Sequence, residues 1–327
     1  MGRTMIKQQT LFKWLALSAL VEWLLVRTLT RAAIHIPKSP EIAAGYGVVN
    51  QIGLVAAAFV ALLSLVLLLW IAWEGRREVW LSLTLVGLGG VSVLFLVIVP
   101  PTWLALLYQL LGVTAVFFIC AGAVRAYGGK PVWPEMVTLL IPAAALLAGL
   151  LYQLLPNLYA LMGWSGPPPL TGVLFNLGEL LVIGSVLAWW WTSRSLSNRS
   201  RSWIIWVLAA IPALLFALSF WRDPAMTGIL TIWSTGLTLF LPWPVYALAL
   251  WLVGVTVLAN WQPDPPLAYA ILLLVSAGYT PQLSSQLFCA LIALWLLARP
   301  LPITQNHPVH HRQPDNFRTE PQLITDN

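Results

Sequence analysis

The sequence contains very little charge. Of its 327 residues, 9% are charged and 59% are hydrophobic, whereas a soluble domain carries roughly 25% charged residues. Because a water-facing surface needs charge, this composition excludes an ordinary soluble domain. A lipid-facing surface has no such need, and the 19 tryptophans also favour a membrane protein, since tryptophan is enriched at membrane–water interfaces.

Residues and motifs that carry chemistry are also scarce. The two cysteines, Cys120 and Cys289, lie in separate apolar runs, which excludes a disulfide framework and a CxxC motif. His35 is the only histidine in the predicted helical region, so two histidines of this chain cannot ligate one haem there. Nucleotide-binding loops, HExxH and GxSxG are absent from the sequence. We therefore expect no cofactor and no metal site, and an enzymatic role is disfavoured.

Long uncharged runs dominate what is present. A helix needs about 20 apolar residues to cross a bilayer, and continuous runs, rather than alternating ones, favour helices over a barrel. The sequence predicts an all-α, polytopic transmembrane bundle as a single domain over residues 1–299, followed by a disordered polar tail over 300–327. Seven runs are clear crossings: 14–36, 52–73, 79–99, 102–124, 136–155, 171–192 and 203–221.

Basic residues alternate between the loops that join these runs. The segments before the first run, at 74–78, at 125–130 and at 193–202 hold most of the lysine and arginine, whereas 100–102 and 156–170 hold none. By the positive-inside rule the N-terminus is cytoplasmic. Topology explains the net charge of +6, so no nucleic-acid partner is expected. The expected location is the cytoplasmic membrane of a prokaryote.

The last third of the chain has two long uncharged runs broken by proline. The run 226–260 is broken at 241–244 and is predicted to form a hairpin of two short helices. The run 266–298 is broken at 280–282, and its first piece, 267–279, would be only about 20 Å long. We predict a half-helix that enters and turns back, followed by a crossing over 282–298. About ten crossings result, whereas two full hairpins would give eleven.

The first predicted helix contains four ionisable residues, which are costly inside a membrane and therefore candidates for function. Arg27, Arg31 and His35 are spaced by four and form one stripe, whereas Glu22 points almost opposite at 100° per residue. The stripe has three interpretations. In the first, the long arginine side chains extend to the lipid headgroups or water at the interface. In the second, the stripe binds an anion or a lipid headgroup. In the third, it contacts a partner subunit.

The sixth predicted helix contains Asn176 and Glu179, an i, i+3 pair on one face. Glu179 and Glu22 lie at matching depths of about 15 Å in their respective spans. If they face each other, repulsion in a medium of low polarity would leave one of them protonated, and the pair could carry protons or bind a cation. The alternative is a structural carboxyl group that is hydrogen-bonded to Asn176 or paired with Arg27.

The break at Thr280-Pro281-Gln282 is the third candidate site, with Gln282 and Gln286 as its binding residues. Broken helices expose backbone groups that coordinate ions and substrates in transporters, although a simple re-entrant turn explains the break equally well. Other polar side chains in the spans, Gln109, Tyr152 and Gln153, are expected to form interhelical hydrogen bonds. The glycines at 87, 89 and 90 are expected to allow close helix packing.

Three functions fit these features. A secondary transporter of a small solute or cation would use the mid-depth glutamates and the broken helices. A non-catalytic membrane subunit or scaffold would explain the short loops and the lack of motifs, and would have partner membrane subunits. A lipid-active enzyme would use Arg27, Arg31 and His35, but no nucleophile or metal set accompanies them. Each of the three places the protein in a lipid bilayer.

Overall fold

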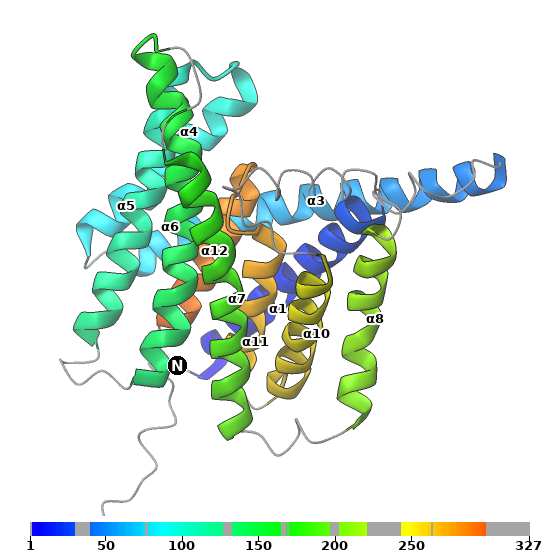
Figure 1. Cartoon of the computed structure of the whole chain (residues 1–327). Helices are drawn as coiled ribbons and strands as arrows, with labels where there is room; N and C mark the ends of the chain where they lie inside the picture. Colours follow the sequence, from blue (N-terminus) through cyan, green and yellow to red (C-terminus); the bar gives the residue numbers. More distant parts are fainter. Residues whose placement is uncertain are drawn as a thin grey trace, which may run out of the picture.

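The computed structural model describes residues 2–29, 40–75, 78–126, 133–164, 168, 170–196, 203–220, 243–262 and 264–298. Every regular element in these ranges is a helix, as predicted (Figure 1). The elements are α1 (Gly2–Glu22), η1 (Trp23–Leu29), α3 (Pro40–Glu74), α4 (Val79–Val97), α5 (Thr102–Ala126), α6 (Trp133–Leu161), α7 (Thr171–Leu196), α8 (Trp203–Phe220), α10 (Trp243–Asn260), α11 (Pro265–Ala277) and α12 (Ser284–Ala298).

Six of the described helices are long and apolar enough to cross a membrane, and they coincide with the first six predicted crossings. Their apolar spans are Gln9–Val26, Ala44–Glu74, Val79–Val97, Thr102–Ala126, Met136–Leu161 and Thr171–Ser193. The seventh predicted crossing corresponds to α8. The total of about ten crossings and the cytoplasmic N-terminus stay predictions. Residues 221–242, where the first part of one predicted hairpin falls, and the predicted tail lie outside the described residues.

Several helix boundaries differ from the predicted ones. Helix α3 starts at Pro40, twelve residues before the second predicted crossing begins at 52, and proline fits the first turn of a helix, where its missing N–H would have no partner anyway. Helix α6 continues through Pro156 to Leu161, whereas the fifth predicted crossing ends at 155. Proline is tolerated inside membrane helices where side chains and neighbouring helices take up the freed backbone groups.

The helices form a closed ring around a central pair. Going around the ring, each helix packs against the next in the order α1, α3, α4, α5, α6, α7, α10 and α8, and η1 closes the ring against α8. Inside it lie α11 and α12, which pack against each other and against α1, α3, α5, α6 and α10. The last two described helices of the chain therefore form its centre.

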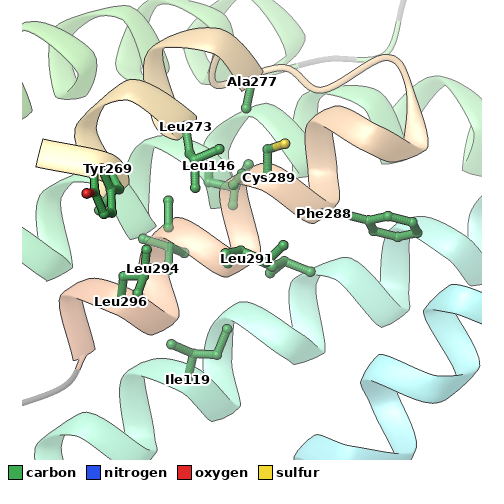
Figure 2. Close-up of a cluster of buried hydrophobic side chains, with 14 of the residues drawn as sticks. Ile119, Leu146, Tyr269, Leu273, Ala277, Phe288, Cys289, Leu291, Leu294 and Leu296 are labelled. Carbon is green, nitrogen blue, oxygen red and sulfur yellow. The ribbon is translucent and has the colours of Figure 1, made fainter. Parts of the chain in front are cut away.

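The two central helices are buried on almost every side. Figure 2 shows them running antiparallel, with Tyr269 near Leu296 at one end and Ala277 near Cys289 at the other. Ile119 of α5 and Leu146 of α6 reach them from the ring. A helix that is apolar all around needs such enclosure. We call α11, α12 and the residues that join them the central hairpin.

The central hairpin is too short to cross a bilayer. Its helices have 13 and 15 residues, or about 20 and 22 Å at 1.5 Å per residue, against a hydrocarbon core of about 30 Å. The short helix predicted at 267–279 is present as α11, and the predicted break follows it. The helix predicted over 282–298 is present as α12, which returns alongside α11 and is about 22 Å long.

Aromatic side chains anchor the end of the central hairpin. The rings of Phe12, Trp70 and Trp295, from α1, α3 and α12, lie 5.8–6.0 Å apart between centroids. Offset and edge-on aromatic pairs at such distances contribute about 0.5–1.5 kcal/mol each beyond the area that they bury. The contact therefore fixes the C-terminal end of α12 against the two helices that precede it by more than 200 residues.

The outside of the ring is apolar and has tryptophans at its margins. Large apolar side chains of α3, α4, α5, α7 and α8 are exposed, which in water would make an aggregation-prone surface. Tryptophan prefers the membrane–water interface. Seven strongly exposed tryptophans lie at or near helix ends, namely Trp73, Trp80, Trp103, Trp133, Trp164, Trp191 and Trp203. The ring is therefore an integral membrane structure whose helices end close to the two interfaces.

Helix α3 departs from the common direction. In Figure 1 it runs across the direction of α7, α8 and α10. Its apolar span of 31 residues is about 46 Å long. An apolar helix longer than the hydrocarbon thickness is accommodated by tilting, so its oblique course agrees with its length.

Candidate functional site

The candidate site is centred on residues 278–283, which join α11 to α12 and which we call the hairpin break. Gly278 ends α11 with φ +71°, a conformation that residues with a side chain rarely adopt. The break packs against Gly149, which lies at the middle of the span Met136–Leu161. It therefore lies near mid-depth, where unpaired backbone groups are most costly.

Two glycines of the ring make room for Tyr279 in the hairpin break. A methyl group on Gly149 of α6 would collide with the Tyr279 carbonyl oxygen, with the carbonyl carbon 2.6 Å away. A methyl group on Gly178 of α7 would come within 2.5–2.6 Å of the Tyr279 ring. The main chain of Tyr279 thus lies on one helix and its ring on the next, and the site needs glycine at both positions.

A hydrogen-bonded series of amides supports the hairpin break from the side of α5 and α6. Gln153 donates from Nε2 to the carbonyl oxygen of Pro281 at 3.0 Å. One turn further along α6, Asn157 donates to Oε1 of Gln109 at 3.1 Å. These bonds confirm the predicted interhelical role of Gln109 and Gln153.

The first turn of α12 is capped by the side chain of Gln286, a residue of the same helix. Oε1 of Gln286 accepts hydrogen bonds from the backbone N–H groups of Gln282 at 2.8 Å and Leu283 at 3.4 Å. Groups at the start of a helix lack partners within it, so Gln286, which is buried, stabilises the break. This local role accounts for Gln286, and the exposed Gln282 takes part through its backbone.

Glu179 lies beside the hairpin break. It is buried on α7, next to Gly178, which lies against the ring of Tyr279. Phe175, one turn earlier, packs its ring against Tyr279 at 5.8 Å and against Tyr152 of α6 at 5.5 Å. Asn176 shares this end of α7 and is half-buried. The structure thus brings Asn176, Glu179 and the break together.

A cavity of about 230 Å³ opens beside the hairpin break. Its lining comes from η1, α6, α7, α10, α11 and the break itself, and is almost wholly apolar. Tyr279 and Gly278 lie at its wall, as does Val182, which is one turn from Glu179 on the same face of α7. Trp23 and Trp189 add indole rings from two sides of the bundle.

A proline and a tryptophan in the cavity wall are coupled through one carbonyl group. Pro142 lies inside α6 and has no N–H to donate to the carbonyl oxygen four residues earlier, that of Thr138. Trp189 of α7 donates its indole N–H to that oxygen at 3.1 Å. An interhelical bond thus replaces the missing bond of the helix, and it fixes the indole ring at the cavity.

Glu22 approaches the cavity from the first helix. The buried face of α1 comprises Phe12, Leu15, Ala16, Ala19 and Glu22, and it packs against α3 and α11. Trp23, the next residue, lines the cavity and begins the π-helical segment η1. Because α7 packs against α6 and α10, Glu22 and Glu179 enter from different parts of the ring. The hypothesis that they face each other stays a prediction.

The π-helix also changes the register on which the first-helix stripe was predicted. In a π-helix hydrogen bonds join residues five apart. The side chains of residues 22 and 27 therefore point in more similar directions around the helix axis than a rotation of 100° per residue predicts. The side chain of Arg27 and all of Arg31 and His35 lie outside the described residues. The anion, headgroup and partner interpretations of that stripe stay predictions.

Comparisons with known proteins give no family for this chain. No family model, no curated protein and no solved structure matches it. Within the described residues, no three histidine, cysteine, aspartate or glutamate side chains are grouped closely enough to hold a metal ion. The site must therefore be interpreted from its own geometry.

Sequence reasoning found the break and Glu179 but missed the residues around them. Gly149, Gly178, Tyr279, Pro142 and Trp189 were not singled out. Two signals were present in the sequence: a proline in the middle of a predicted span, and a tyrosine directly before a predicted break. The glycines at 87, 89 and 90 differ in role, because a methyl group would meet side chains at the first two and open space at Gly90.

Proposed function

We propose that this integral membrane protein is a secondary transporter, with the hairpin break and the adjoining cavity as its substrate site. The observation that carries the proposal is the juxtaposition, near mid-depth, of a broken hairpin, a buried carboxyl group on α7 and a cavity of about 230 Å³. Transporters bind substrates near the bilayer midplane at breaks of this kind.

The packing around the break supports movement as well as binding. Tyr279 lies outside a continuous helix, and its contacts are with Gly149, Gly178 and the ring of Phe175. The hydrogen bonds described above join the break to the ring through Gln153 and to α12 through Gln286. Discontinuous segments at such sites absorb the change between inward-open and outward-open states.

The proposal also accounts for the apolar cavity better than a scaffold does. A subunit that only fills a complex is expected to have a solid interior, because protein interiors are close-packed with few voids larger than a water molecule. Here the cavity touches five helical elements and the break. A scaffold function does not require a cavity of this kind near a buried glutamate.

Transport predicts that the cavity is reached from both membrane faces in turn. After Cys120 and Cys289 are replaced by alanine, Ala249→Cys places a thiol in the cavity wall on α10. In sealed vesicles, we expect an impermeant, charged thiol reagent to label it from either face, with the preferred face set by an imposed proton gradient.

The matched control is Ala58→Cys, which is exposed on α3 but faces lipid under this assignment. Because the reagent is charged and stays in water, we expect Ala58→Cys to remain unlabelled. Labelling of Ala249→Cys from neither face, or from one face under every gradient, would contradict transport.

A further inference from the structure

The polar groups in the lining of the cavity are mostly bound within the protein. The hydroxyl group of Ser185 donates to the carbonyl oxygen of Leu181 at 2.7 Å, and the backbone N–H of Gly278 donates to the carbonyl oxygen of Leu274 at 2.9 Å. The indole N–H of Trp189 has its partner on α6. Among the described lining residues, none carries a charged side chain. A sugar or an inorganic ion would lose its interactions with water there, so the group that fits this cavity is apolar.

The volume of the cavity sets how much of an apolar molecule it holds. In another protein, an apolar cavity of about 150 Å³ stays dry and accepts benzene, which has six carbon atoms. By proportion, the cavity of about 230 Å³ accommodates about nine carbon atoms. The wall of an empty cavity lacks the dispersion contacts that a filled interior has, so an apolar group of this size would bind favourably.

The cavity lies at the depth of the hydrocarbon chains of the bilayer. Its lining includes residues from the middle third of the apolar span of α7 and from the middle third of α10, namely Val182, Ser185, Val186, Ala249, Leu250 and Val253. At this depth the apolar molecules that surround the protein are the chains of lipids. A hydrocarbon chain therefore matches the position of the cavity as well as its chemistry.

We propose that the substrate is a lipid-like amphiphile and that about nine carbon atoms of its hydrocarbon chain occupy the cavity. This inference rests on the proposed transport function and names the substrate class of that site. A hydrocarbon alone would cross the bilayer unaided, because it is as apolar as the lipid chains. The polar head of an amphiphile is costly to move through hydrocarbon, so an amphiphile is a chain-bearing molecule that needs a transporter.

The central hairpin makes the interior of the cavity distinguishable from the lipid-facing surface. Leu274 and Val275 of α11 line the cavity and are half-buried, and the ring helices stand between α11 and the bilayer. Lipid chains that surround the outside of the ring therefore do not reach these two residues. A chain that contacts them lies inside the cavity.

Photo-cross-linking of the full chain in phospholipid nanodiscs tests the inference. The two probes are a phosphatidylcholine and a free fatty acid, each with a diazirine near the methyl end of a chain, and mass spectrometry locates the cross-links. We expect cross-links at Leu274 or Val275 as well as on the exposed faces of α3 and α4. Cross-linking of α11 by phosphatidylcholine identifies a two-chain membrane lipid as the source of the chain, whereas cross-linking by the fatty acid alone identifies a single-chain amphiphile.

Variants that fill the cavity locate the bound chain. The phenyl ring of Ala249→Phe would take about two thirds of the cavity, by comparison with the cavity that accepts benzene, so cross-linking at Leu274 and Val275 should fall about threefold or more. Ala145→Phe adds the same ring from α6 and should have the same effect. The matched control is Ala58→Phe, which adds the ring at an exposed position of α3 and should leave cross-linking of α11 unchanged.

The outcomes separate this inference from the proposed function. Cross-links confined to the outside of the ring would overturn the inference, even if Ala249→Cys is labelled from both faces and transport stands. Cross-links at α11 that neither filling variant reduces would overturn it as well, because the chain would then reach α11 by another route. Cross-links at α11 that both filling variants reduce, together with labelling of Ala249→Cys from one face only, would support the chain site while contradicting transport.

Discussion

Replacing Gly149 by alanine is expected to lower the free energy of unfolding by about 1–3 kcal/mol or more, the usual cost of forcing an extra methyl group into a packed interior. The methyl group would collide with the backbone of Tyr279, which cannot move aside as a flexible side chain would. The hairpin break must therefore shift away from α6. The midpoint of unfolding in a denaturing detergent titration measures the loss.

The matched control for this substitution is Gly90→Ala. Gly90 also lies inside a helix, but nothing lies within 4 Å of the position that its methyl group would occupy. Alanine is favoured over glycine in helix interiors by roughly 0.5–1 kcal/mol, so this variant should be as stable as the parent or more stable. Equal stability of the Gly149→Ala and Gly90→Ala variants would mean that the break does not lie on α6 as described.

Replacing Trp189 by phenylalanine is expected to destabilise the protein by about 1–3 kcal/mol through the buried carbonyl oxygen of Thr138, which loses its donor. The smaller ring also enlarges the cavity, which adds a further cost. Because Pro142 has no N–H, α6 itself cannot supply a replacement donor. Unfolding midpoints of the two proteins give the total effect.

A double-mutant cycle with Pro142→Ala tests the contribution of the Thr138 carbonyl group. Alanine at 142 restores the N–H that belongs to the Thr138 carbonyl in an α-helix, so Trp189→Phe should cost about 1–3 kcal/mol less in that background. The loss of ring volume at 189 is the same in both backgrounds, and any coupling through the cavity that Pro142 and Trp189 share adds to the measured difference. An identical cost of Trp189→Phe with proline or alanine at 142 would show that the indole bond contributes no stability.

The parts of the fold that are encoded locally were predictable. Apolar run length and loop composition located the first six spans, and the proline break at 280–282 predicted the end of the short helix now seen as α11. Errors arose at proline. The rule that proline ends a helix failed at Pro156, because in a membrane helix the freed groups find partners in the helix itself and its neighbours.

The site was less predictable because its key features are contacts between distant segments. Gly149 and Gly178 matter through Tyr279, more than 100 residues later in the chain, and no local pattern distinguishes them from Gly90. The π-helix that follows Glu22 also has no sequence signature, so a helical wheel could not give the register beyond it. Glu179 was found because an ionisable residue in an apolar run is conspicuous in any single sequence.

The position of the central hairpin has a consequence for biogenesis. The ring helices α1 to α10 precede residues 265–298 in the chain, and a chain is synthesised from its N-terminus at about 5–20 residues per second. The ring helices are therefore synthesised before the segment that fills their centre. The ring helices can reach their final packing only when α11 and α12 have followed them into place.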